Sequence, residues 1–176
     1  MKKGVKKVLS VVLSAALVFT GVNIGDIATV NAADVKTITV NNAASLKGAQ
    51  AELDSATGDV VINITSDITL TEKDWEGLLF YKTAEDYSRN LTVNGNGHKI
   101  TGLNNQDNKK GLVAQPVLNN RKGSLVGLFS AVCAKEFTVK DLKLDSAEIA
   151  DVRYIGSLAG YVAAYDVNIE NVNVTK

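Results

Sequence analysis

The sequence predicts an all-β fold of stacked parallel coils, a parallel β-helix, that follows a signal peptide and an N-terminal amphipathic capping helix. The first observation behind this prediction is an internal repeat: residues 128–145 and 158–175 align at a constant offset of 30. Segments that bury the same positions at a fixed period are typical of successive turns of a solenoid. The aligned apolar pairs are Leu128 with Leu158, Val132 with Val162, Ala134 with Ala164, Phe137 with Val167, Val139 with Ile169, Leu142 with Val172, and Leu144 with Val174.

The second observation is a change of parity inside each copy. Apolar residues occupy 137 and 139 and then 142 and 144, so the alternation of a straight strand breaks at Lys140-Asp141, and it breaks again at Glu170-Asn171. Two short strands joined by a corner would keep all four side chains facing one interior. A bulge that recurs in both copies is the alternative, whereas a helical period of about 3.6 residues fits neither copy.

Residues 1–32 are predicted to be a secretory signal peptide. Four lysines precede an apolar run over residues 8–22, and small or compact residues lead to a cleavage point before Ala33. A retained membrane anchor is the alternative, but the run is shorter than the roughly 20 residues that span a bilayer. The sequence therefore predicts a secreted protein with an extracellular or cell-surface location.

Residues 33–58 are predicted to form a short strand and the capping helix. Residues 35–40 alternate as a strand does, and a helical pattern follows over residues 42–53, with Asn42 or Ser45 able to cap it. Leu46, Ala49 and Leu53 fall on one face of this helix. An amphipathic helix at this place could cover the first coil of a solenoid, whose core would otherwise meet water.

Residues 59–176 are predicted to form the coils. Strands are expected at 60–64, 68–70, 91–93 and 98–100, with irregular loops over 71–90 and 104–124. Asn94-Gly95 between two apolar runs is also a hairpin signal, so an antiparallel pairing of 91–93 with 98–100 is the alternative there. Strand 169–174 runs almost to Lys176 with no cover after it, so we expect further coils or domains beyond Lys176, and association of the isolated chain through that edge.

Composition narrows the classes of partner. Of the 19 basic and 19 acidic residues, the leader holds four Lys and Asp26, so the mature chain keeps 15 against 18. This mildly acidic balance gives no reason to expect nucleic acid or an anionic membrane as a partner. Cys133 is the single cysteine, which excludes an intrachain disulfide and predicts a small buried residue, with a reactive thiol as the alternative.

Several motifs give the chain a family resemblance. Leu91-Thr-Val-Asn-Gly-Asn-Gly-His-Lys-Ile-Thr-Gly-Leu103 is similar to a "DGNGHTISGL" coil, and 127–129 and 155–161 are similar to "GLFG" and "GGLVGY" segments. The chain thus resembles bacterial surface proteins with right-handed parallel β-helices of the pectate-lyase-like superfamily, and more narrowly those with GLUG-type repeats. Asn94 replaces the usual Asp and Ser130 a common glycine. The resemblance covers most of 43–176 and implies the fold more specifically than the activity, because the family includes adhesins and carbohydrate-active enzymes.

The best candidates for ligand binding lie in the acidic, aromatic loop over residues 72–86. Trp75 and Tyr81 could stack on sugar rings, and Asp74 and Glu76 could hydrogen-bond to them. A solvated loop with buried aromatic side chains is the alternative.

The sequence predicts no catalytic, metal-binding or cofactor-binding residues. Enzymes on this kind of fold carry carboxylates with Arg or Lys on the outside of one sheet. Here the outward positions hold Thr138, Lys140 and Lys143 over Asn168, Glu170 and Asn173, which is a mixed polar set. His98 is the single histidine, so histidine-based metal sites and Ser-His or Cys-His catalysis are not expected.

The resulting hypothesis is a secreted or cell-surface module for adhesion that binds a polysaccharide or a host protein and is non-catalytic in this fragment. One alternative is the N-terminal part of a polysaccharide lyase or glycoside hydrolase. Another is a structural spacer of a larger surface protein. A carboxylate cluster on one sheet would favour the enzyme, an exposed aromatic patch would favour binding, and neither would favour the spacer.

Overall fold

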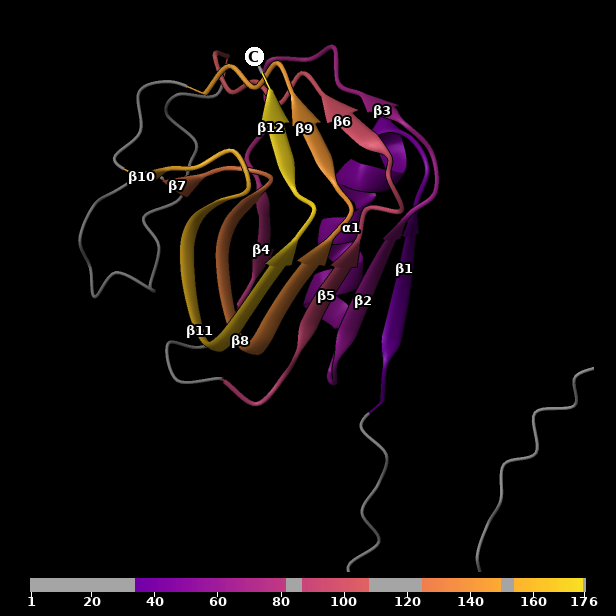
Figure 1. The fold of residues 1–176 in the computed structure, drawn as a ribbon, viewed down its shortest axis with the longest axis vertical. Helices are drawn as coiled ribbons and strands as arrows, with labels where there is room; N and C mark the ends of the chain where they lie inside the picture. Colours follow the sequence, from indigo (N-terminus) through magenta and orange to yellow (C-terminus); the bar gives the residue numbers. More distant parts are fainter. Residues whose placement is uncertain (1–33, 82–86, 108–124, 150–153, 176) are drawn as a thin grey trace, which may run out of the picture. The chain divides into compact units, whose positions relative to one another are not determined.

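The computed structural model describes residues 34–81, 87–107, 125–149 and 154–175. The predicted signal peptide, residues 1–32, lies outside these ranges. Strands predominate in the described part of the chain, and α1 is its one helix (Figure 1). The elements are β1 (Lys36–Val40), α1 (Ala43–Ser55), β2 (Val60–Ile64), β3 (Ile68–Thr69), β4 (Leu78–Phe80), β5 (Leu91–Asn94), β6 (Lys99–Thr101), β7 (Leu125–Val126), β8 (Phe129–Lys140), β9 (Lys143–Asp145), β10 (Tyr154–Ile155), β11 (Ala159–Glu170) and β12 (Asn173–Thr175).

The strands form three sheets. The largest has the order β1-β2-β5-β8-β11, with β4 beside the first half of β8, and the others have the orders β12-β9-β6-β3 and β10-β7. Each pair of named strands in the described residues is parallel. The prediction of an all-β chain with parallel strands is therefore confirmed.

The two copies of the internal repeat run through the same sheets: β8 and β11 lie in one sheet, and β9 and β12 lie in another. β11 pairs with β8 so that Glu170 lies beside Lys140, and β12 pairs with β9 so that Val174 lies beside Leu144. Lys140 and Glu170, which the repeat places at outward positions in the same register, form an ion pair with 3.7 Å between Lys140 Nζ and Glu170 Oε2. The predicted register is confirmed.

The break in alternation at Lys140-Asp141 is a corner between two sheets. β8 ends at Lys140, and β9, which belongs to another sheet, begins at Lys143. Asp141 has φ 50° and Asn171 has φ 52°, a left-handed conformation that Asp and Asn adopt more readily than other non-glycine residues. Asn171 Nδ2 donates to Asp141 Oδ1 at 2.9 Å, so the two corners stack.

The glycine-rich stretch after β5 is also a corner. β5 pairs with β2 and β8, whereas β6 pairs with β3 and β9 in a different sheet, so the hairpin alternative is wrong. A Cβ atom on Gly95 would lie 2.3 Å from the carbonyl oxygen of Asp141. Glycine is required there because the next coil passes directly against the backbone.

The helix begins where its cap predicts. Asn42 is the N-cap, and its side chain and that of Ser45 form a reciprocal capping box. Leu46, Ala49 and Leu53 are buried, as the spacing predicts, and they join the same hydrophobic core as the strands.

One strand was missed within a segment that the sequence leaves irregular. β4 lies inside the predicted loop 71–90 and pairs with residues 129–132 in the first half of β8. Its three residues are too few to show alternation, so the pairing that creates the strand is tertiary. Most of the other predicted loop, 104–124, falls outside the described residues.

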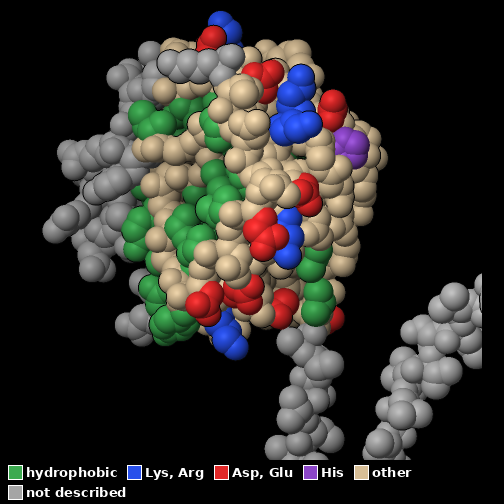
Figure 2. Space-filling model, in the orientation of Figure 1, with side chains coloured by type: hydrophobic (Ala, Val, Ile, Leu, Met, Phe, Trp, Pro, Cys, Tyr) green, Lys and Arg blue, Asp and Glu red, His purple; other side chains and the backbone are tan. Residues whose placement is uncertain are grey.

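The core is continuous from β1 to β9 and then opens. Phe137, Val139 and Leu144 are fully buried, whereas their stacked partners on β11 and β12, Val167, Ile169 and Val174, are 48–52% exposed. Figure 2 shows hydrophobic side chains gathered on the side of the molecule that carries β11 and β12. The two repeat copies thus have the same inward pattern but different burial.

Candidate functional site

Two adjoining cavities lie between α1 and the segment that leads into β4. One, of about 250 Å³, is lined by Lys47, Gln50 and residues 74–78. The other, of about 260 Å³, is lined by residues 43–44, Lys47 and residues 70–72. Lys47 borders both cavities, and we call the two together the helix groove.

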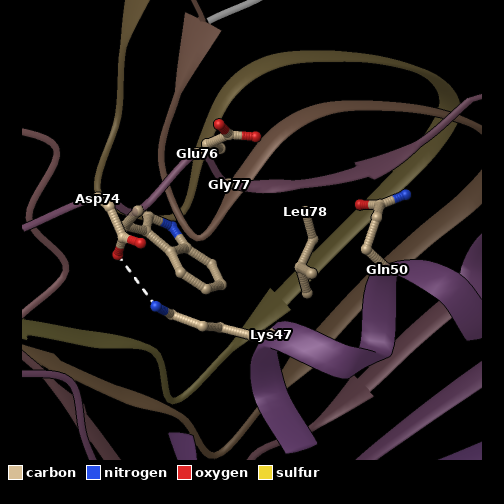
Figure 3. Close-up of a pocket in the computed structure, with 7 residues that line it drawn as sticks. Lys47, Gln50, Asp74, Glu76, Gly77 and Leu78 are labelled. Carbon is tan, nitrogen blue, oxygen red and sulfur yellow. Dashed lines mark hydrogen bonds and ion pairs between the residues drawn. The ribbon is translucent and has the colours of Figure 1, made fainter. Parts of the chain in front are cut away.

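Lys47 fastens the outer wall of the groove to the helix. Its Nζ donates to Glu72 Oε2, and to Asp74 Oδ1 at 3.0 Å. Figure 3 shows the Lys47 side chain reaching from α1 toward Asp74, with Glu76 on the far side of the cavity. The hydrogen bonds with Glu72 and then with Asp74 raise the pKa of Lys47 above its ordinary value. The ammonium group therefore remains charged at neutral pH, beside two carboxylates.

Gln50 fixes the other end of the groove. Its Oε1 accepts from the backbone N–H of Leu79 at 2.7 Å, and its Nε2 donates to the carbonyl oxygen of Leu79 at 3.1 Å. The amide side chain thus satisfies both backbone groups of Leu79, as a neighbouring strand would. The groove is preorganised because both walls are held by side chains of one helix.

Trp75 lies in the groove wall but is 4% exposed. Its Nε1 donates to the carbonyl oxygen of Gly127 at 2.8 Å, which joins the segment before β4 to the turn before β8. A sugar ring could stack on this indole only if its face were uncovered. Asp74 and Glu76, the exposed neighbours, are the predicted site residues that a ligand in the groove can reach.

Tyr81 lies apart from the helix groove. It follows β4 and is partly buried, and its pKa is raised by burial first, with Cys133 and Tyr87 close by. Cys133 is itself buried, as expected. The four predicted site residues therefore divide into Asp74, Trp75 and Glu76 at the groove and Tyr81 among other aromatic residues.

Sequence reasoning missed the two helix residues that line the groove, Lys47 and Gln50, and the aromatic pair formed by Tyr87 and Tyr165. Lys47 and Gln50 lie 27 and 29 residues from their partners Asp74 and Leu79, and nothing local indicates these pairs. Tyr87 and Tyr165 form a ring pair with centroids 5.2 Å apart. One signal could have drawn attention to Tyr165, because it replaces Lys135 at an outward position of the repeat.

Among the described residues, no group of three or more His, Cys, Asp or Glu side chains could hold a metal ion. His98 Nδ1 lies 3.2 Å from Asp67 Oδ1 on the surface. The backbone N–H of Lys99 and then His98 lower the pKa of Asp67. In the same part of the chain, no helix is long and apolar enough to cross a membrane.

The chain was compared with protein families, curated proteins and solved structures. No curated protein and no solved structure matches the chain. Residues 37–176, which include the helix and all the strands described above except Lys36 at the start of β1, match the family of pectate lyase-like adhesive domains. Because this match covers most of the chain, the protein belongs to the pectate lyase-like adhesive domain family.

Proposed function

We propose that this chain is a secreted or cell-surface adhesion module that binds a glycan and does not cleave it. The observation that carries the proposal is the match of residues 37–176 to an adhesive domain family. The signal-peptide pattern of residues 1–32 supports export. The motifs between 91 and 161 favour a bacterial surface protein with GLUG-type repeats.

The proposed scaffold is a right-handed parallel β-helix. Its support is the parallel pairing of β8 with β11 and of β9 with β12 in separate sheets, at one offset. Stacked coils of this kind give a rigid rod with long surfaces. Such a scaffold suits adhesion, because residues on successive coils are held at fixed spacing.

The proposed binding site is the helix groove. A cavity of about 250 Å³ is smaller than the usual pocket for a drug-sized ligand, and it suits one sugar unit, with the adjoining cavity available to the next. Asp74 and Glu76 provide acceptors for sugar hydroxyl groups, and Lys47 provides a donor. The Lys47–Asp74 ion pair and the Gln50–Leu79 hydrogen bonds keep these groups in place without a ligand.

The proposal is tested by binding of the purified protein to immobilised arabinoxylan, galactomannan, mucin glycans, polygalacturonate and alginate. Glu76→Gln is the groove variant, because it removes a charge while keeping the size of the side chain. Glu170→Gln is the matched control, an exposed carboxylate on β11 that lies outside the groove.

We expect wild-type and Glu170→Gln protein to bind at least one glycan equally and Glu76→Gln protein to bind it more weakly. Absence of binding to every glycan would contradict the proposed function. Equal binding by all three proteins would retain the function but remove the groove as its site.

A further inference from the structure

Tyr87 and Tyr165 form an aromatic pair on the outer surface. Their ring centroids are 5.2 Å apart and their planes are inclined by 50°. Tyr165 is 74% exposed, and Tyr87 is partly buried against it. Tyr81 lies close to both Tyr87 and Cys133. We call Tyr87 and Tyr165 the tyrosine platform.

The exposure of Tyr165 follows from its position in the coil. Lys135, the residue at the same position one coil earlier, is exposed although β11 stacks directly on its strand. Val167 behaves differently: it is 48% exposed, whereas its stacked equivalent Phe137 is fully buried. Residue 165 therefore lies at an outward corner that stays open when another coil covers the strand.

The fold itself does not require an aromatic residue at this corner. Lys135 occupies it in the preceding coil, where β8 has the same inward residues and the same register. A large ring that is 74% exposed contributes little burial to the core. The repeat therefore does not require a tyrosine at 165. The ring meets Tyr87 and leaves most of its own surface open to a ligand.

The segment that follows Tyr87 is held against the rest of the fold by hydrogen bonds and a ring contact. The carbonyl oxygen of Arg89 accepts from the backbone N–H of Lys135 at 2.7 Å, which fastens the segment after Tyr87 to β8. The Arg89 guanidinium lies 4.5 Å from the ring centroid of Phe80 and donates to the carbonyl oxygen of Ala56 at 3.2 Å. The platform is thus held in place before a ligand arrives, which lowers the entropic cost of binding.

Polar acceptors lie next to the platform on β8 and β11. Glu136 and Asp166 are adjacent across the two strands, and Glu136 Oε1 accepts from Asn168 Nδ2 at 3.2 Å. The C–H bonds on one face of a sugar can lie on the electron-rich face of a tyrosine ring while its hydroxyl groups donate to carboxylates. At this corner the two carboxylates outnumber the one nearby cation of the described residues, the exposed Lys135 of the preceding coil, so a neutral sugar fits better than an acidic one.

We propose that Tyr87 and Tyr165 bind a neutral sugar unit by stacking, at a second contact separate from the helix groove. This proposal rests on the proposed glycan-binding function and names the ligand class. Tyr165→Lys is the decisive variant, because it copies the residue that the preceding coil carries at this corner and so preserves the fold. Tyr165→Phe keeps the ring, and Lys135→Ala is the matched control at the equivalent position.

The probes are soluble arabinoxylan and galactomannan as neutral glycans and polygalacturonate as an acidic one, with affinity measured by calorimetry. Transfer of magnetisation from tyrosine ring protons to sugar C–H protons reports the stacking directly. We expect Tyr165→Lys to weaken binding of a neutral glycan about tenfold, while Tyr165→Phe and Lys135→Ala bind as the wild type does. The magnetisation transfer should disappear in Tyr165→Lys alone.

The outcomes separate this proposal from the broader function. Binding of a neutral glycan that is unchanged in Tyr165→Lys overturns the platform and leaves glycan binding intact. Binding to polygalacturonate alone overturns the ligand class and the platform together. No binding to any of these three probes overturns the platform, and the proposed function falls as well when mucin glycans and alginate are also not bound.

Discussion

A single backbone angle turns the chain at the corner between β8 and β9. Asp141 has φ 50°, and its carboxylate accepts a hydrogen bond from Asn171, which has the same conformation in the next coil. The apolar residues on both sides of the corner, Val139 before it and Leu142 and Leu144 after it, are fully buried. The fold of a coil therefore depends on two kinds of residue. One accepts the left-handed conformation at the corner, and the others are apolar and point into the core.

The corner makes a prediction for Asp141. Asp141→Val should lower the free energy of unfolding by about 1–2 kcal/mol, because a β-branched residue is strained in the left-handed region. Asp141→Gly should cost less, since glycine accepts this conformation and only the hydrogen bond to Asn171 is lost. Urea denaturation measures both, and equal stability of the two variants would argue against strain as the cause.

A second prediction at this scale compares two stacked residues. Leu144→Ala should cost about 2–5 kcal/mol, because it removes buried apolar atoms and leaves a cavity. Val174→Ala is the matched control: residue 174 lies beside Leu144 in the ladder but is 51% exposed. Its cost should stay below about 1 kcal/mol. Similar denaturation midpoints for both variants would contradict the burial difference between the coils.

The helix and β4 depend on each other at the scale of elements. β4 pairs with β8 along one edge, and Gln50 of α1 satisfies both backbone groups of Leu79 on the other. An unpaired strand edge exposes donors and acceptors that must be satisfied by water or another chain. The helix thus covers a strand edge as well as the core, and it forms the groove while doing so.

This arrangement predicts the effect of Gln50→Ala. The substitution should lower stability by about 1–3 kcal/mol, because it leaves the Leu79 N–H and C=O groups without their partner. Hydrogen exchange at the Leu79 amide should accelerate more than at β2 amides. Glu52→Ala on the same helix is the control, since its carboxylate makes only an exposed ion pair to Lys36 at 3.3 Å. Unchanged exchange at Leu79 would show that the side chain does not protect β4.

At the scale of the whole molecule, the polar groups fit the proposed binding function. The carboxylate of Asp74 is paired with Lys47 at 3.0 Å, and the outward row on β8 and β11 pairs Lys140 with Glu170. A glycosidase needs two carboxyl groups at a defined separation across one glycosidic bond. The described surface offers hydrogen-bonding groups and a tyrosine pair, to which we assign the proposed binding.

The purified protein should therefore show no turnover of polygalacturonate, alginate, xylan or mucin glycans. Reducing-end and unsaturated-product assays measure this, with a commercial lyase as the positive control for each substrate. Turnover that is lost in Asp74→Ala or Glu76→Ala protein would move the helix groove from a binding site to an active site.

Local pattern alone determined much of this architecture. The offset between 128–145 and 158–175, the corner at Lys140-Asp141, the helix after Asn42 and its buried stripe were all readable in the sequence, because alternation, caps and repeats are properties of neighbouring residues. The chain's membership of an adhesive family agrees with the resemblance carried by residues 91–161.

Tertiary structure alone decided the sites. β4 is a strand because β8 and Gln50 pair with it. The outer wall of the groove is held because Lys47 meets Glu72 and Asp74, 25 and 27 residues further along the chain. Trp75 faces the turn before β8 and is buried, while Tyr165 meets Tyr87 at an outward corner. Each of these contacts joins segments far apart in the chain. The contacts arise from the stacking of the coils, and no periodic sequence pattern in either segment indicates them.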